Sequence, residues 1–254
     1  PMEVEQEPAQ SVTFAGLLVI VQLALLLGLF GSVSVVIDQS TADLWLGFYN
    51  TLSVDLGRPI NQASDARAWI HPGVERIERY VGALGDLRGG KGVPLSVYLH
   101  AIDTSSEALA FGKLLSVQER TLLREPNAIL VDPADIGKLN ANVGTTIEIN
   151  HKRAYIAGVV EGLRSVGGVS VIASFATART LAPETAEQVV FYLIRLRPGF
   201  EPHVVASEIA DRNLHPHYSV WPAQAFSIQS QKYWLLESGA GIGAGFASLL
   251  TLIV

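Results

Sequence analysis

The stretch that decides the predicted fold runs from residue 189 to 221, V-V-F-Y-L-I-R-L-R-P-G-F-E-P-H-V-V-A-S-E-I-A-D-R-N-L-H-P-H-Y-S-V-W. Its first eight residues are an apolar run typical of a buried strand. R-P-G-F-E-P is typical of a turn, and Pro202 suits the first turn of the helix that H-V-V-A-S-E-I-A-D-R-N-L predicts. A second strand begins at Tyr218, so the stretch predicts one β-α-β arm.

A second arm lies nearer the start of the chain. A-D-L-W-L-G-F (42–48) predicts a strand, A-S-D-A-R-A-W-I (63–70) a short helix, and V-E-R-I-E-R-Y-V-G-A-L (74–84) an alternating strand. Two such arms on either side of an insertion predict a split, ferredoxin-like α/β sandwich, and the fold class is therefore α+β.

The insertion, residues 93–174, predicts a β-rich lobe. L-S-V-Y-L-H-A (95–101) alternates between apolar and polar residues, and T-I-E-I-N-H-K-R-A-Y-I-A-G-V-V predicts a hairpin that turns near residues 150–152. A-I-L-V-D is typical of a buried strand, and Ser105-Ser106 predicts the cap of a short helix.

An uncharged run, residues 12–37, predicts a first transmembrane helix. At about 1.5 Å per residue such a helix exceeds the roughly 30 Å hydrocarbon core of a bilayer. A cleaved signal peptide and a buried soluble helix are the alternatives. A signal peptide requires a basic segment before the apolar run, whereas this chain begins with Glu3, Glu5 and Glu7 and no basic residue. We therefore expect residues 1–11 to be a cytoplasmic tail.

A second apolar run, residues 233–254, predicts the start of another transmembrane helix. Tyr233 and Trp234 are typical of aromatic anchors at a membrane interface. The run is shorter than a complete span, so we expect the sequence to end inside it. Small residues permit close helix packing in membranes. The glycines for which we predict such packing are Gly28, Gly31, Gly239, Gly241, Gly243 and Gly245.

Residues 38–232, between the two runs, predict a folded extracytoplasmic domain. They contain all 18 basic residues, and the whole chain has a net charge of −6, so the composition argues against a nucleic-acid partner. The sequence has no cysteine, which excludes disulfides, cysteine-ligated zinc and thiol catalysis. Charge does not predict the orientation, because the segment is far longer than the roughly 60 residues over which the positive-inside rule acts.

No set of residues predicts catalysis, a cofactor or a metal site. G-D-L-R-G-G-K-G (85–92) has the spacing of a phosphate-binding loop, but Gly92 replaces the Ser or Thr that would bind magnesium. His215 and His217 lack a third ligand at a recognisable spacing. We interpret His71 and His100 as structural. The acid pairs Asp132/Asp135 and Glu75/Glu78 are interpreted as turn and solvated-face charges, and we expect no enzyme activity from this chain.

The order of these parts resembles that of the MacB/FtsX-like ABC transporter permeases, the type VII or mechanotransmission class, and is nearest to the DevC-type branch. The resemblance rests on A-D-L-W-L after the first apolar run, H-P-G-V-E-R-I-E, L-N-A-N-V-G-T-T-I-E-I, Y-L-I-R-L-R-P-G-F-E-P and Q-K-Y-W-L-L-E-S-G-A-G-I-G. It covers residues 13–254. These motifs are turns and strands of the fold and include no catalytic residue.

The resemblance implies a multi-pass permease of the inner membrane with four spans and a periplasmic domain made of a porter-like and a sabre-like lobe. It implies an ABC ATPase subunit, a homodimer or a paralogous permease, a periplasmic membrane-fusion protein and the lipid bilayer as partners. The function would be efflux, or export of a lipid, glycolipid or lipoprotein, driven by motion passed to the periplasmic domain. Spans three and four, the coupling loop and the usual basic stretch before the first span are absent from the sequence. The alternative is a membrane-anchored binding or sensor module without an ATPase.

Overall fold

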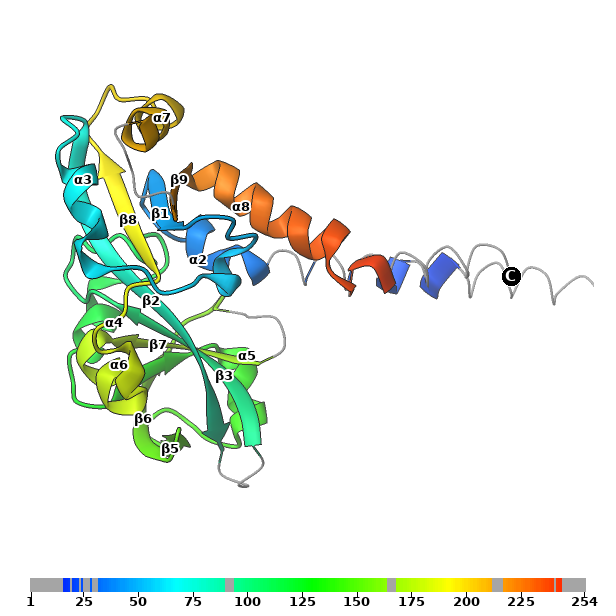
Figure 1. Cartoon of the computed structure of the whole chain (residues 1–254). Coiled ribbons are helices and arrows are strands. Elements are labelled where there is room, and N and C mark those ends of the chain that lie inside the picture. Colours follow the sequence, from blue (N-terminus) through cyan, green and yellow to red (C-terminus); the bar gives the residue numbers. More distant parts are fainter. Residues whose placement is uncertain are drawn as a thin grey trace, which may run out of the picture.

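The structure is a computed structural model in which two lobes share one long strand (Figure 1). It describes residues 16–18, 20–22, 24, 28, 32–89, 94–163, 168–211, 217–239 and 241–243. Strands and helices mix along the chain, which confirms the α/β character expected from the sequence.

The upper lobe in Figure 1 is built on four strands in the order β2-β8-β1-β9, and all neighbours are antiparallel. β8 separates β1 from β2, and β1 separates β8 from β9, so the strands of each predicted β-α-β arm are split by one strand of the other. The bounds are β1 Leu44–Phe48, β2 Val74–Arg88, β8 Phe191–Leu196 and β9 Tyr218–Pro222.

Helices cover both faces of this sheet. Because side chains alternate along β1, neighbouring residues of the strand pack against different helices. Leu44 and Leu46 belong to a core with Val205 of α7, whereas Trp45 packs on Phe226 of α8 with ring centroids 6.1 Å apart. The helical segments of the upper lobe are η1 Val54–Leu56, η2 Gln62–Asp65, α3 Ala66–Trp69, α7 Pro202–Asp211 and α8 Ala223–Lys232.

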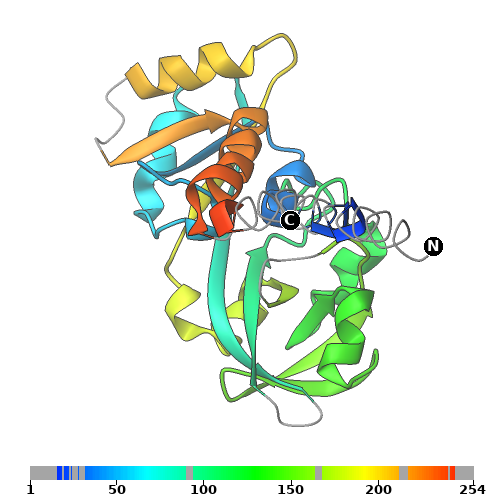
Figure 2. The same cartoon turned by 90° about the vertical axis from the view of Figure 1, so that its right-hand side faces the viewer.

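The lower lobe is a closed ring of six strands in the order β2-β3-β7-β4-β6-β5, and β5 pairs back onto β2 (Figure 2). Closure leaves no unpaired edge within the ring. β3–β7 and β4–β6 are the parallel pairs. The remaining bounds are β3 Pro94–Ile102, α4 Val117–Leu122, β4 Ala128–Val131, α5 Pro133–Leu139, β5 Thr146–Ile149, β6 Lys152–Val159, β7 Val169–Ser174, α6 Phe175–Leu181 and η3 Pro183–Thr185.

Strand β2 belongs to both lobes. From Val74 to Tyr80 it pairs with β8, and from Val81 to Arg88 it pairs with β3. The strand predicted to end at residue 84 therefore continues to Arg88 and pairs with β3 over its second half.

The prediction of a short helix after Ser105 and Ser106 is wrong. Turns follow there, and helix α4 begins later, at Val117. Phe111 lies at φ 51°, a left-handed conformation that a helix does not accept. The cap of α4 is Ser116, which forms a capping box with Glu119.

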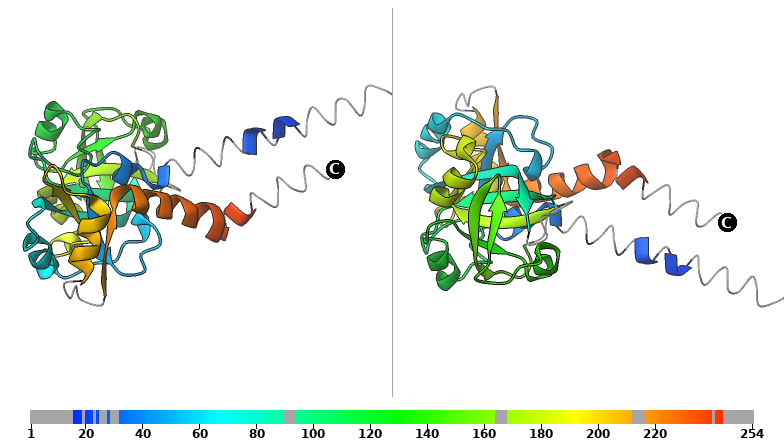
Figure 3. Two further views of the ribbon diagram at one scale, coloured as in Figure 1. Left: turned by 90° about the horizontal axis from the view of Figure 1, so that it is seen from above. Right: turned by 90° about the horizontal axis from the view of Figure 1, so that it is seen from below.

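The described ends of the two terminal segments, α2 and α8, lie next to each other on one side of the domain (Figures 1 and 3). The first ends in α2, Val35–Asp38, and the second begins with α8 and its continuation η4, Tyr233–Glu237. Within the described ranges, no helix combines the length and the apolar composition needed to cross a bilayer. Parts of both predicted spans, residues 12–37 and 233–254, lie outside those ranges.

Candidate functional site

A cluster of hydrogen-bonded polar side chains joins the two terminal segments, and we call it the junction network: Ser34, Asp38, Ser227 and Gln231. Asp38 accepts hydrogen bonds from the Ser34 hydroxyl at 2.6 Å and from the Ser227 hydroxyl at 2.7 Å. The Gln231 amide donates to Ser34 Oγ at 2.8 Å. Ser34 and Ser227 are buried, so α2 and α8 are joined by hydrogen bonds that water does not replace easily.

The loop after β1, residues 49–57, holds α8 from the other side. The Gln229 amide donates to the Thr51 carbonyl at 2.6 Å, and the Val54 amide donates to Ser230 Oγ at 3.2 Å. Trp234 completes this contact, because its indole N–H donates to Asp55 Oδ1 at 3.2 Å. The start of the second terminal segment is therefore fixed to the loop that follows strand β1 of the upper sheet.

The second terminal segment has a break at Ser238. η4 is a π-helical turn, and Ser238 leaves it with extended backbone, at φ −78° and ψ 148°. The Ser238 hydroxyl accepts a hydrogen bond from the Gly241 amide at 3.3 Å, as a residue that caps the next helix does. Tyr233 and Trp234 thus lie on the domain side of the break, with their rings 5.9 Å apart.

The predicted packing glycines differ in their surroundings. A Cβ at Gly241 would lie 2.0 Å from the Leu235 carbonyl oxygen, so this glycine permits a close backbone approach at the break. A Cβ at Gly28, Gly239 or Gly243 would meet no described atom within 4 Å. Gly31 and Gly245 lie outside the described residues. Packing of these glycines against another helix stays a prediction.

A loop of the lower lobe, residues 103–116, reaches the first terminal segment. Lys113 donates from its ammonium to the Asp38 carbonyl at 2.8 Å and from its backbone to the Gln39 carbonyl at 2.9 Å. The Thr41 amide donates to the Leu109 carbonyl at 3.0 Å. The junction therefore contacts both lobes.

Two buried charged side chains shape this loop. Glu78 of β2 accepts hydrogen bonds from the Leu109 amide at 2.6 Å and the Ala110 amide at 3.1 Å. Arg120 of α4 donates to the carbonyls of Asp103 at 3.1 Å and Ala110 at 2.9 Å. The interpretation of Glu78 as a solvated charge is wrong, because the loop covers it and leaves it 5% exposed.

Burial is the main cause of a pKa shift in both side chains. Loss of water raises the pKa of Glu78 to about 7, although the two amides and Arg76 favour the charged form. Loss of water also lowers the pKa of the Arg120 guanidinium, and the charge of Glu78 opposes this shift. Glu78 therefore titrates near neutral pH at the point where the loop meets β2.

His100 is structural, as the sequence predicts. Its ring nitrogens lie 2.6 Å from the Tyr80 hydroxyl and 2.7 Å from the Ser170 hydroxyl. Burial lowers the pKa of His100 to about 3, so the ring is neutral. Ser170 is fully buried and cannot reach a substrate, so this Ser-His pair does not form a hydrolytic site.

His71 is also structural. Its Nδ1 accepts a hydrogen bond from the Gly73 amide at 3.0 Å, so Nε2 carries the proton and donates to Glu208 at 2.7 Å. Asp132 caps α5 and, like Asp135, is buried; both are therefore less solvated than the sequence predicts.

The structure describes parts of the two motifs that could have been a phosphate-binding loop and a metal site. Gly85 lies inside strand β2, where a phosphate-binding loop would need a turn before a helix, and residues 90–93 lie outside the described part. Among the described residues, no group of three His, Asp or Glu side chains is placed to hold a metal ion. His215 lies outside them.

Comparison with known proteins gives structural similarity alone. No family model matches the sequence, and no curated protein matches it. The periplasmic region of MacB from Actinobacillus actinomycetemcomitans is similar, with a TM-score of 0.49 and 11% identity over 76% of this chain and 94% of that chain. The extracellular domain of the noncanonic ABC-type transporter YknZ from Gram-positive bacteria has a TM-score of 0.47 and 11% identity, over 70% and 98%. A domain of a putative permease protein from Porphyromonas gingivalis has a TM-score of 0.44 and 18% identity, over 70% and 88%.

Proposed function

We propose that this chain is the permease subunit of an ABC exporter of the MacB/FtsX-like class, nearest to the DevC-type branch. A separate ATPase subunit would drive it, and residues 38–232 would lie outside the cytoplasm. The subunit would pass ATP-driven motion to its extracytoplasmic domain, as a homodimer or with a paralogous permease. A periplasmic membrane-fusion protein would complete the export path for a drug-like compound, a lipid, a glycolipid or a lipoprotein.

The observation that carries this proposal is the junction network. A domain inserted between two membrane spans must begin and end at one face, and α2 and α8 meet this requirement side by side (Figure 3). Because Asp38 bonds to side chains of both segments, the two segments are coupled before they reach the domain. A displacement of the pair would act on the upper lobe through α8 and on the lower lobe through residues 103–116.

The two lobes suit the roles implied by the sequence resemblance. The upper lobe, with its split β-α-β arms, would be the porter-like lobe, and the closed ring would be the sabre-like lobe. The spacing at residues 85–92 would supply no nucleotide site, because Gly85 lies within a strand. ATP would therefore act only through the partner subunit.

The test is purification of the full-length protein from membranes of its own cell through an affinity tag. We expect vanadate-sensitive ATPase activity to co-purify with an ABC ATPase subunit. Ser106→Cys and Val143→Cys, both at exposed positions, should react with a membrane-impermeant maleimide in intact cells.

Two results would contradict the proposal. Labelling only after lysis would place the domain in the cytoplasm. Purification of the tagged chain without any ATPase subunit would favour an anchored binding or sensor module.

A further inference from the structure

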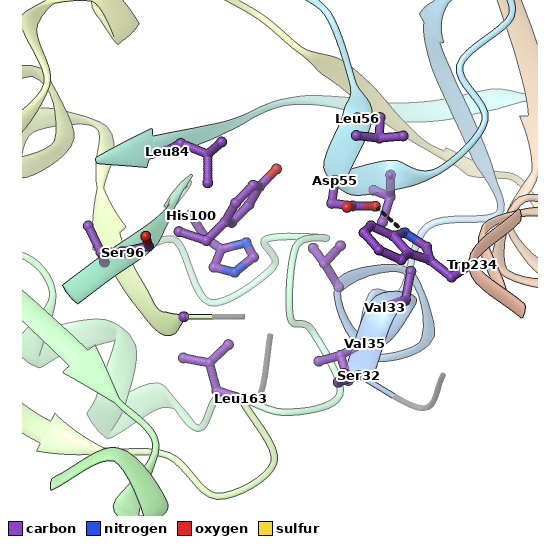
Figure 4. A pocket seen from close by; sticks show the side chains of 15 residues that line it. Ser32, Val33, Val35, Asp55, Leu56, Leu84, Ser96, His100, Leu163 and Trp234 are labelled. Carbon is purple, nitrogen blue, oxygen red and sulfur yellow. Dashed lines mark hydrogen bonds between the residues drawn. The ribbon is translucent and has the colours of Figure 1, made fainter. Parts of the chain in front are cut away.

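A cavity of about 320 Å³ lies between the two lobes (Figure 4). Its lining includes Val33 and Val35, the chain neighbours of Ser34 in the junction network. Leu84, His100 and Leu163 of the lower lobe line one side. Asp55 and Trp234 line the other (Figure 4). Its volume falls at the lower end of the roughly 300–1,000 Å³ that small-molecule sites occupy.

The walls of this cavity are mainly hydrocarbon. Eight aliphatic side chains from both lobes and from the first terminal segment contribute to them: Val33, Val35, Val36, Val54, Leu56, Leu84, Val97 and Leu163. Of the described residues that line the cavity, only Asp55 carries a formal charge at neutral pH, and its Oδ1 already accepts the indole N–H of Trp234.

The polar atoms of His100, at the floor of the cavity, already have hydrogen-bond partners. Both ring nitrogens of His100 have partners, Tyr80 and Ser170, and the ring is neutral because it is buried. An anionic ligand group placed here would lose its water without gaining an opposite charge, which is costly. A hydrocarbon ligand meets no such cost.

The rim of the cavity is apolar and exposed. Leu84 is 73% exposed and Leu56 is 42% exposed, and both belong to the lining. Other lining residues, Val33 and Trp234, come from the two segments that continue into the apolar terminal runs. If those runs span a membrane, the rim lies where the domain meets the bilayer surface.

We propose that this cavity binds one hydrocarbon chain of a membrane amphiphile, taken from the adjacent bilayer. The inference rests on the proposed function, because a membrane-anchored chain is what places the rim at the lipid surface. The hydrocarbon chain contacts the aliphatic walls, and the polar head stays at the rim near Leu56 and Leu84. The cavity thus gives the domain a lipid-binding site outside the membrane.

The test uses the full-length protein in phospholipid nanodiscs with two photoactivatable probes, each carrying a diazirine on its acyl chain. One probe is a free fatty acid and the other is a phospholipid, so the two sources of the chain are distinguished. After irradiation, mass spectrometry locates the labelled residues. We expect labels on Tyr98 and Leu163, which lie on the lower-lobe side of the cavity.

Three variants sharpen the test. Leu84→Lys places a charge at the rim of the cavity and should lower labelling of Tyr98 and Leu163 more than about tenfold. Leu84→Met keeps the rim apolar and should retain labelling. Val143→Lys adds the same charge at a similarly exposed residue away from the cavity and should also retain it.

The proposal is overturned if labels are confined to the terminal runs, or if Leu84→Lys and the wild-type protein label Tyr98 and Leu163 equally. The first result would mean that another segment of the chain or a partner fills the cavity. Failure of the proposed function is a separate result: the protein would purify without an ATPase while Tyr98 and Leu163 were still labelled.

Discussion

Replacement of Glu78 by glutamine should remove a pH dependence of stability that this structure predicts. The folded-state pKa of Glu78 is about 7, above the ordinary value of 4.5, because the carboxyl is buried. Between these two values the folded protein binds a proton that the unfolded chain has lost, so the free energy of unfolding falls as pH rises. At about 1.4 kcal/mol per pKa unit, the loss reaches roughly 3 kcal/mol above pH 7.

The assay is denaturant unfolding of the full-length protein in detergent, followed by tryptophan fluorescence between pH 4.5 and 8.5. Glu78→Gln cannot ionise, so its unfolding free energy should lose this slope. Glu75→Gln, three residues earlier on the exposed face of β2, should keep it. Hydrogen exchange adds a local measure, since the Leu109 and Ala110 amides bond to Glu78. Equal pH slopes in the wild-type protein and in Glu78→Gln would refute this account of the buried carboxyl.

Three further predictions concern the junction and the loop. Asp38→Ala leaves two buried hydroxyls without their acceptor, and we expect about 2–3 kcal/mol less protection of α8 amides from hydrogen exchange, whereas Asp211→Ala should have no effect there. Gly241→Ala must displace the backbone around Ser238 and should lower the thermal stability of the helix junction; equal behaviour of Gly241→Ala and Gly243→Ala would contradict the close approach. Arg120→Met removes donors from two loop carbonyls and should lower the free energy of unfolding by about 2–4 kcal/mol in a denaturant titration; an unchanged value would show that the loop holds its shape without the guanidinium.

Local patterns predicted most strands of this fold. The strands expected at 42–48 and from residue 218 correspond to β1 and β9, and the expected turn near residues 150–152 joins β5 to β6. Closure of the lower lobe into a ring was not predicted. It depends on β5 returning to β2 at Leu87 and Arg88, about 60 residues away in sequence, and periodicity within a strand does not contain this pairing.

Two pairs of residues show where local sequence rules predict the structure better than the interpretation made from the sequence. Glu75 and Glu78 were paired as solvated charges, but residues three apart on a regular strand point to opposite faces, so the two carboxyls need not share one environment. Ser116 and Glu119 have the spacing of a capping box, a stronger signal for a helix start than Ser105-Ser106. Local rules do not predict the junction network, because Asp38 and Ser227 are 189 residues apart in the sequence.

Strand β2 explains how one junction can act on two lobes. The junction contacts the lower lobe through residues 103–116, and Glu78 of β2 holds that loop by two amides. It contacts the upper lobe through α8, whose Phe226 packs on Trp45, and Trp45 packs edge-on against Tyr80 of β2 at 5.8 Å. Both contacts therefore reach β2 within two residues of each other, where its pairing changes from β8 to β3. Because the strand is continuous there, a rotation of one lobe against the other would have to bend β2 near Tyr80, and under the proposed function a push from the paired terminal segments would arrive at the same place.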